Sequence, residues 1–210
     1  MFGEDFIQRA ILAAPTILFA LTVHEFFHAW TALRFGDTTA RDMGRLTLNP
    51  LAHLDLMGTA VFFISQFRFG WAKPVPVNLM NLRGNVRVAD FWISAAGPLS
   101  NMGLALIFGI ILRMVLFLDM PIPLVAVKFL LLSVIINVSL AFFNLIPMYP
   151  LDGSHILRNI LPARYEEAIV QFERIAPFIL LLLIITRVFW FVLGPVVSLF
   201  VYFFSGVSIS

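Results

Sequence analysis

The sequence lacks cysteine and is poor in charged residues. Without a thiol, disulfide bonds and thiolate metal sites are excluded, so a transition metal could be bound only by histidine and carboxylate side chains. Charged residues make up 12% of the 210 positions and hydrophobic residues 60%. Soluble globular domains hold about 25% charged and about 45–50% apolar residues. The composition therefore excludes an ordinary soluble domain and indicates a membrane protein.

The basic residues do not form a patch. Lys and Arg stand singly between apolar stretches and the net charge is only +2, so no nucleic-acid partner is expected. Lys and Arg instead favour the cytoplasmic side of a membrane. Two groups between the first two long apolar stretches are therefore expected on that side. They are Arg34, Arg41 and Arg45 in the first group, and Arg68, Lys73, Arg83 and Arg87 in the second.

Several apolar stretches are long enough to cross a bilayer as helices, which takes about 20 residues. Residues 7–35, 88–118 and 125–147 each reach this length. Two further apolar blocks, 175–185 and 188–202, predict either one long bent span or two shorter spans.

Two segments between the first two spans do not fit a transmembrane helix. Residues 54–67 are apolar but number only about 14, which suits a re-entrant or interfacial segment. In the segment Lys73-Pro74-Val75-Pro76-Val77-Asn78 the prolines exclude a helix. Their alternation with valine suits either an interfacial loop or an edge strand that could pair with an unwound substrate strand.

These patterns together predict the fold class. We expect an all-α polytopic membrane protein of about four to six transmembrane helices, with a re-entrant segment and a short membrane-associated β-hairpin or edge strand. No internal repeat or soluble linker divides the chain. The prediction is a single membrane-embedded domain over residues 1–210, with its core at 7–160 and C-terminal helices at 164–207.

The first span contains the sequence His24-Glu25-Phe26-Phe27-His28, an HExxH motif. Side chains four residues apart project from the same face of a helix, so His24 and His28 could bind one zinc ion. Glu25 lies on an adjoining edge, where its carboxylate could contact a zinc-bound water without being a ligand. Zinc lowers the pKa of such a water to about 7, and the carboxylate can remove its proton to give a hydroxide that attacks a peptide carbonyl.

The motif lies within a predicted membrane span, where ionisable side chains cost free energy to bury. Such residues are therefore expected to be functional. At about 1.5 Å per residue, His28 lies about 9 Å and His24 about 15 Å inside Arg34, the expected cytoplasmic boundary. A metal bound there would be submerged in the membrane but reachable from the cytoplasmic side.

A catalytic zinc needs a third protein ligand. The metzincin continuation of the motif fails, because Thr31 and Arg34 stand where Gly and His are required. Asp152 is the favoured candidate, since it follows a span that returns to the side of Arg34, and nearby prolines and Gly153 interrupt the helix. The alternative ligands are three glutamates in a charged, interfacial stretch, namely Glu166, Glu167 and Glu173.

The motifs resemble those of the site-2 protease family of intramembrane zinc metallopeptidases, in a compact form without a PDZ or CBS module. The resemblance rests on HExxH and on residues 144–153, which look like the NxxPxxxLDG pattern of that family. Three further segments strengthen it, at residues 44–50, 70–78 and 96–101. It implies that His24, His28 and Asp152 bind one Zn²⁺, that Glu25 is the catalytic acid and base, and that Asn144 helps to arrange the substrate or transition state.

The expected function is hydrolysis of peptide bonds in or near transmembrane segments of membrane proteins, by attack of zinc-bound water with Glu25 as general base and acid. The expected partners are transmembrane protein substrates and the lipid bilayer. The expected location is a prokaryotic inner membrane, with a multi-pass chain and an active site nearer the cytoplasmic face.

Other polar residues and other functions are less favoured. Asn101, in a stretch of small residues, suits helix packing better than catalysis. His53 and His155 are candidates for auxiliary ligands, although interfacial histidines are more often only hydrogen-bonded. A zinc transporter would need additional His and acidic residues along several spans. A di-iron oxidase would need more ligands than this chain, with its four histidines, offers.

Overall fold

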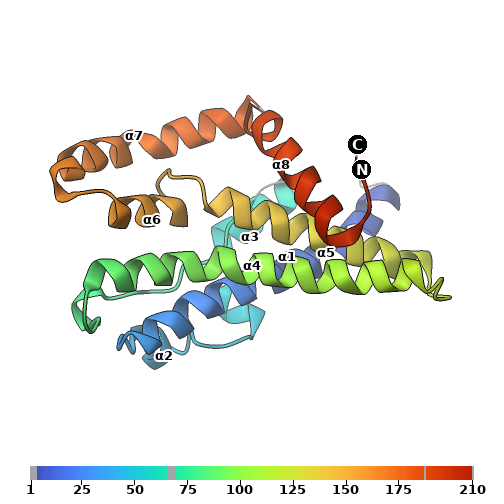
Figure 1. Cartoon of the computed structure of the whole chain (residues 1–210), viewed down its shortest axis with the longest axis horizontal. Coiled ribbons are helices and arrows are strands. Elements are labelled where there is room, and N and C mark those ends of the chain that lie inside the picture. Colours follow the sequence, from blue (N-terminus) through green and yellow to red (C-terminus); the bar gives the residue numbers. More distant parts are fainter. Residues whose placement is uncertain (1–3, 66–69, 187, 210) are drawn as a thin grey trace.

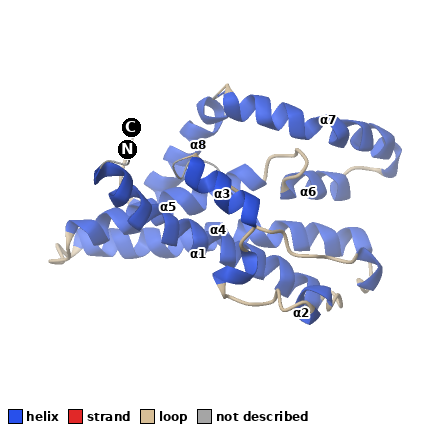
Figure 2. Cartoon of the chain, turned by 180° about the vertical axis from the view of Figure 1, so that it is seen from behind, coloured by secondary structure: helices blue, strands red, loops and turns tan. Residues whose placement is uncertain are grey.

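The computed structural model describes residues 4–65, 70–186 and 188–209. Residues 66 and 67 of the predicted re-entrant segment, and Arg68, lie outside the described residues. Over the described ranges the chain is helical (Figures 1 and 2). The helices are α1 (Glu4–Arg34), α2 (Thr39–Asp42), α3 (Leu56–Ile64), α4 (Val86–Phe117), α5 (Leu124–Asn144), α6 (Asp152–Ile160), α7 (Glu166–Ile185) and α8 (Val188–Ser205). Short 3-10 turns lie at η1 (Pro50–His53), η2 (Leu79–Asn81) and η3 (Ala163–Tyr165).

Four helical segments are long and apolar enough to cross a membrane. They are Ile11–Arg34, Val86–Phe117, Leu124–Asn144 and Ala163–Ile185, and a shorter apolar helix covers Phe191–Ser205. The prediction of a polytopic all-α membrane protein is confirmed at this level. The two C-terminal blocks form separate helices, α7 and α8, which run in different directions (Figure 1).

The predicted β-hairpin or edge strand is wrong for the described residues. No strand forms there, and only an isolated antiparallel bridge joins Leu54 to Ala72. Beside it the Lys73 N–H donates to the His53 carbonyl oxygen over 2.8 Å. The next residues that could extend the ladder include Pro74 and Pro76, which have no N–H to donate. The segment is therefore extended but cannot continue a sheet.

The short helix α3 does not span the membrane. Its 9 residues extend only about 14 Å, less than half of a hydrocarbon core of about 30 Å. The helix begins after Asp55, whose side chain accepts a hydrogen bond from the Gly58 N–H at 2.7 Å. This agrees with the prediction that the apolar segment before residue 67 is not transmembrane.

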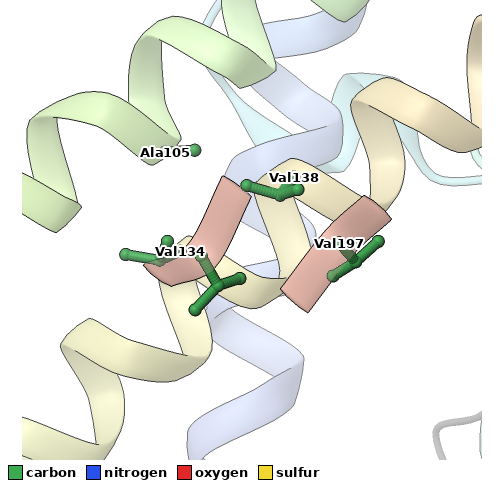
Figure 3. Close-up of a cluster of buried hydrophobic side chains, with 5 residues drawn as sticks. Ala105, Val134, Val138 and Val197 are labelled. Carbon is green, nitrogen blue, oxygen red and sulfur yellow. The ribbon is translucent and has the colours of Figure 1, made fainter. Parts of the chain in front are cut away.

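The three central spans α1, α4 and α5 pack against one another, and α8 packs across α4 and α5 (Figures 1 and 2). A core of small and β-branched side chains joins α4, α5 and α8. Figure 3 labels four of these side chains. Its buried members are Ala105, Val134, Val138, Val197 and Val201. Small side chains let helices approach closely in a membrane, where association depends on packing.

Helix α7 stands apart from the central helices, with α6 between it and α4 in both overall views (Figures 1 and 2). Its start is tied to α6 by Arg158, which pairs with Glu166 and lies 3.6 Å from Glu173. Large side chains such as Phe178 and Ile185 are exposed along its length. An apolar surface of this kind suits contact with lipid.

Candidate metal centre

Helix α1 places the two histidines of the HExxH motif together. His24 and His28 are buried, and their Nε2 atoms lie 3.0 Å apart. Asp152, the first residue of α6, reaches the same point from a segment more than a hundred residues away. Its Oδ2 lies 3.1 Å from Nε2 of His24 and 3.4 Å from Nε2 of His28. The structure therefore brings together the three residues predicted as ligands.

Glycine is required for α6 to begin at this position. A Cβ atom on Gly153 would lie 2.4 Å from the Leu145 carbonyl oxygen and 2.3 Å from that of Ile146. Only a residue without a side chain allows the start of α6 to pack this closely on the end of α5. This contact fixes the position of the preceding Asp152 beside α1.

The geometry and chemistry of the three donors fit a metal ion. Bonds of about 2.0–2.1 Å in a tetrahedron place ligand atoms about 3.3 Å apart, close to the 3.0, 3.1 and 3.4 Å found here. Asp152 Oδ2 is buried and accepts no hydrogen bond from the described residues. Two imidazoles and one carboxylate form a ligand set that zinc accepts. In the described part of the chain, this is the one group of three such side chains able to hold a metal.

Gly97 of α4 leaves the space in which these donors meet. A Cβ atom at this position would lie 2.3 Å from Nε2 of His28 and 2.6 Å from Nε2 of His24. Both distances are far shorter than any van der Waals contact. Any side chain here would therefore displace the imidazoles or fill the site.

Helix α4 also orients the two imidazoles. Nδ1 of His24 lies 2.6 Å from Oδ1 of Asn101, and Nδ1 of His28 lies 2.7 Å from the Ile93 carbonyl oxygen. Both partners are acceptors, so each Nδ1 carries the hydrogen and each Nε2 keeps its lone pair for the metal. Asn101 also donates to the Ala20 carbonyl oxygen and to Asn137, which ties α4 to α1 and α5.

Sequence reasoning favoured helix packing over catalysis for Asn101. The packing role is present, but so is the contact with His24. The available signal was spacing, because Asn101 and Gly97 are four residues apart and therefore share one face of α4.

Glu25 is directed to a different partner from the histidines. The side chain is 9% exposed, and Oε2 accepts a hydrogen bond from the Val75 N–H at 2.9 Å. The extended segment at 73–78 therefore lies against the site. Glu25 lies outside the group of three candidate ligands, and its role as catalytic acid and base stays a prediction.

Known proteins with similar sequences identify the family of the chain. Residues 120–186, which include Asp152, match the family model described as peptidase family M50. The protein named "Putative zinc metalloprotease YwhC" of Bacillus subtilis is 36% identical over 187 residues, covering 87% of this chain and 84% of that protein. The chain belongs to peptidase family M50. It is a zinc metalloprotease of this family, to which the site-2 proteases belong.

Two mycobacterial proteins, both named "Putative zinc metalloprotease Rip2", are also similar. The one from Mycolicibacterium smegmatis is 30% identical, covering 94% of this chain and 75% of that protein. The one from Mycobacterium tuberculosis H37Rv is 31% identical, covering 91% and 73%. No solved structure matches the chain.

The other residues considered as ligands in this M50 protein have different partners. Glu166 and Glu173 pair with Arg158. Nε2 of His53 lies 2.8 Å from the Thr47 carbonyl oxygen, and Nδ1 of His155 lies 3.6 Å from Asp90. None of these side chains, nor the exposed Glu167, belongs to the three-residue group. Asn144 donates to the Leu140 carbonyl oxygen at 3.0 Å, and its contact with a substrate stays a prediction.

An apolar cavity of about 520 Å³ lies between α1, α3, α5 and residues 70–72. One stripe of α1 lines it with Ala14, Leu18 and Leu21. Glu25 continues this stripe one turn further, because residues three and four apart share a helix face. The cavity therefore lies along the face of α1 that carries Glu25, on its N-terminal side, and its lining on this helix ends at Thr22.

Proposed function

We propose that this M50 protein is an intramembrane protease that hydrolyses peptide bonds in or near transmembrane segments of membrane proteins. The observation that carries the proposal is the meeting of His24, His28 and Asp152 within 3.4 Å of one another, beside Glu25, on helices suited to crossing a bilayer. The partners are transmembrane protein substrates and the surrounding lipid. The location is a prokaryotic inner membrane, with the site nearer the cytoplasmic face.

His24, His28 and Asp152 would hold one zinc ion. Bound there, zinc acts as a Lewis acid that polarises a carbonyl and lowers the pKa of a coordinated water to about 7. The Nδ1 contacts with Asn101 and Ile93 keep both imidazoles in the tautomer that can coordinate. The chain thus provides a ligand set whose orientation is fixed before a metal enters.

Glu25 is the general base and acid of the proposed reaction. Its carboxylate takes a proton from the attacking water and gives it to the leaving amine, and no covalent intermediate with the enzyme forms. The Val75 N–H holds Oε2 and leaves Oε1 of Glu25 available for this transfer. Asn144, at the end of α5, is proposed to contact the substrate near the scissile bond.

The apolar cavity beside this stripe of α1 supports a substrate segment that is itself apolar. Its lining comes mainly from hydrophobic side chains, and along α1 it extends away from Glu25, from Thr22 to Ala14. A helical substrate hides its carbonyl groups in hydrogen bonds, so it must unwind before cleavage. We therefore expect residues that weaken helices near the cut. Replacing them by Ala or Leu should slow cleavage, and unchanged cleavage would count against this requirement.

The central experiment compares the protein with its Glu25→Gln variant, both purified in detergent. Zinc content is measured, and cleavage of synthetic transmembrane-helix peptides is followed by mass spectrometry. We expect Glu25→Gln to retain zinc and to lose cleavage. Glu167→Gln is the matched control, since Glu167 is exposed on α7 and should keep both properties. Undiminished cleavage by Glu25→Gln would refute the proposed mechanism.

A further inference from the structure

A buried arginine lies behind the candidate general base. Arg45 is 7% exposed, and its Nη2 donates to the Lys73 carbonyl oxygen at 2.6 Å and to that of Pro74 at 3.4 Å. Its Nε is buried without a hydrogen-bond partner in the described part of the chain. A buried guanidinium with neutral partners and an unsatisfied donor lowers stability. Such a group needs an explanation beyond packing.

One peptide group connects Arg45 to Glu25. The Pro74 carbonyl oxygen accepts from Arg45, and the N–H of the same peptide, on Val75, donates to Oε2 of Glu25 at 2.9 Å. Hydrogen bonds in series polarise one another, so the positive guanidinium strengthens the Val75 donor. Pro74 and Pro76 have no N–H, which leaves Val75 as the only backbone donor among these three residues.

The other end of the segment is held by a buried carboxylate. Asp37 is fully buried and accepts hydrogen bonds from the Asn78 N–H at 2.7 Å, and from Asn81 and the Thr39 N–H at 3.0 Å each. Burial acts to raise the pKa of Asp37, but hydrogen bonds from Thr39, Asn78 and Asn81 outweigh it and hold the pKa below its ordinary value. The carboxylate is therefore ionised at neutral pH.

We propose that Arg45 is a positioning residue for peptide hydrolysis, acting through the Pro74–Val75 peptide to fix the carboxylate of Glu25. The inference rests on the proposed role of Glu25 as general base. Asp37 and Arg45 lie on either side of the short helix α2 and hold the segment at 73–78 at both ends. The Val75 N–H between them sets the direction of the carboxylate. A displacement of about 1 Å in such a group costs on the order of a hundredfold in rate.

The test is a double-mutant cycle on the two ends of this link. Arg45→Met removes the guanidinium donors and Val75→Pro removes the N–H. Each should lower kcat on a transmembrane-helix peptide by about ten- to a hundredfold, with KM and zinc content unchanged. The double variant should be no slower than the slower single variant, because both changes break the same link. Arg45→Lys keeps a charged donor and should recover part of kcat.

The matched control is Arg41→Gln in α2, four positions before Arg45. Among the described residues Arg41 pairs only with Asp42, at 3.0 Å, and both side chains are exposed, so kcat should stay at the wild-type value. Amide hydrogen exchange of the peptide covering residues 72–79 gives a readout without catalysis. It should be faster in Arg45→Met than in the wild type and Arg41→Gln, because the segment loses one anchor.

Three outcomes would overturn the proposal. Rate losses that multiply in the double variant would show that Arg45 acts by another route. A raised KM with an unchanged kcat would assign the segment to substrate binding. A wild-type kcat in Val75→Pro would exclude the link even if Arg45→Met did not fold. In each case an inactive, zinc-containing Glu25→Gln enzyme leaves the proposed function standing, whereas an active one removes it.

Discussion

Oδ1 of Asn101 lies 2.6 Å from Nδ1 of His24, across the interface between α4 and α1. The contact joins two residues 77 positions apart in sequence and lies inside the protein, since Asn101 is fully buried. It fixes the tautomer and the ring orientation of His24. The Asn101 side chain also bonds to Asn137 and so joins α4 to both α1 and α5. The geometry of the metal centre therefore depends on how these three helices pack.

Asn101→Leu should weaken zinc binding about ten- to a hundredfold, the range found for the loss of a residue that orients a metal ligand. The leucine cannot accept the His24 Nδ1–H, and Asn137 also loses a partner. Zinc affinity is measured by competition with a chelator. Ser100→Ala is the control, because within the described part of the chain the Ser100 hydroxyl donates only to the Gly97 carbonyl oxygen on its own helix. Equal affinities in the two variants would contradict the orienting role.

Gly97→Ala should abolish zinc binding and cleavage. The new methyl group would lie 2.3 Å from Nε2 of His28, in the space where the three donors meet. Gly103→Ala is a matched control on the same helix, since a Cβ atom there meets nothing within 4 Å. The control should keep zinc and cleavage, and the better helix propensity of alanine should preserve or slightly raise its stability. Metal analysis of both variants after dialysis tests the pair.

Asp152→Ala should lose zinc, while Glu173→Ala and Glu167→Ala should retain it. Asp152 places a carboxylate oxygen within 3.4 Å of both histidines, whereas Glu173 lies near Arg158. Removing the Glu173 pair should change stability by no more than about 1 kcal/mol, because it is partly exposed. Zinc retained by Asp152→Ala and lost by a glutamate variant would assign the third ligand to the other candidate set.

Ser139→Phe should slow cleavage without removing zinc. Ser139 lines the apolar cavity from α5, and a phenylalanine side chain would occupy part of its volume. If the cavity receives the substrate, kcat/KM for a transmembrane-helix peptide should fall by at least about tenfold. Ser139→Ala removes the hydroxyl but leaves the space open, and it should have a much smaller effect. Equal rates in both variants would exclude the cavity as part of the substrate path.

The sequence predicted which three side chains meet at the candidate metal centre, but not the contacts that support them. His24 and His28 follow from one helical spacing, and the direction of the spans brings Asp152 to the same side. The contacts of Asn101 and Gly97 depend on how α4 is rotated against α1, which no local pattern encodes. The contact of Arg45 with Lys73 and Pro74 joins two irregular segments, so no helical or strand periodicity could reveal it.

The predicted strand failed for a local reason that the sequence already contained. Valine and proline alternate at 73–78, and the alternation suggested an edge. However, Pro74 and Pro76 remove the donors that a ladder needs. The N–H between the two prolines, on Val75, donates to the Glu25 side chain rather than to another strand. The segment therefore takes its shape from side-chain anchors at both ends.

The stability of the metal-free protein should fall as pH rises past the ordinary titration range of histidine. His155 on α6 lies 3.6 Å from Asp90 on α4, and this carboxylate raises the pKa of His155 above its ordinary 6.5. Asp152 and Glu173 act in the same direction. Because the folded pKa is raised, the stabilisation is complete below about pH 6.5 and is lost as pH rises through the folded value.

Thermal unfolding in detergent, with a chelator present, checks this expectation between about pH 6 and about pH 9. The chelator is needed because zinc binding strengthens with pH and would oppose the effect. His155→Gln cannot become charged, so its midpoint should fall less over the same range than that of the wild type. The difference between the two curves isolates the contribution of His155, because every other histidine is the same in both proteins. Parallel curves would mean that the contact between His155 and Asp90 does not help to hold α6, and with it Asp152, against α4.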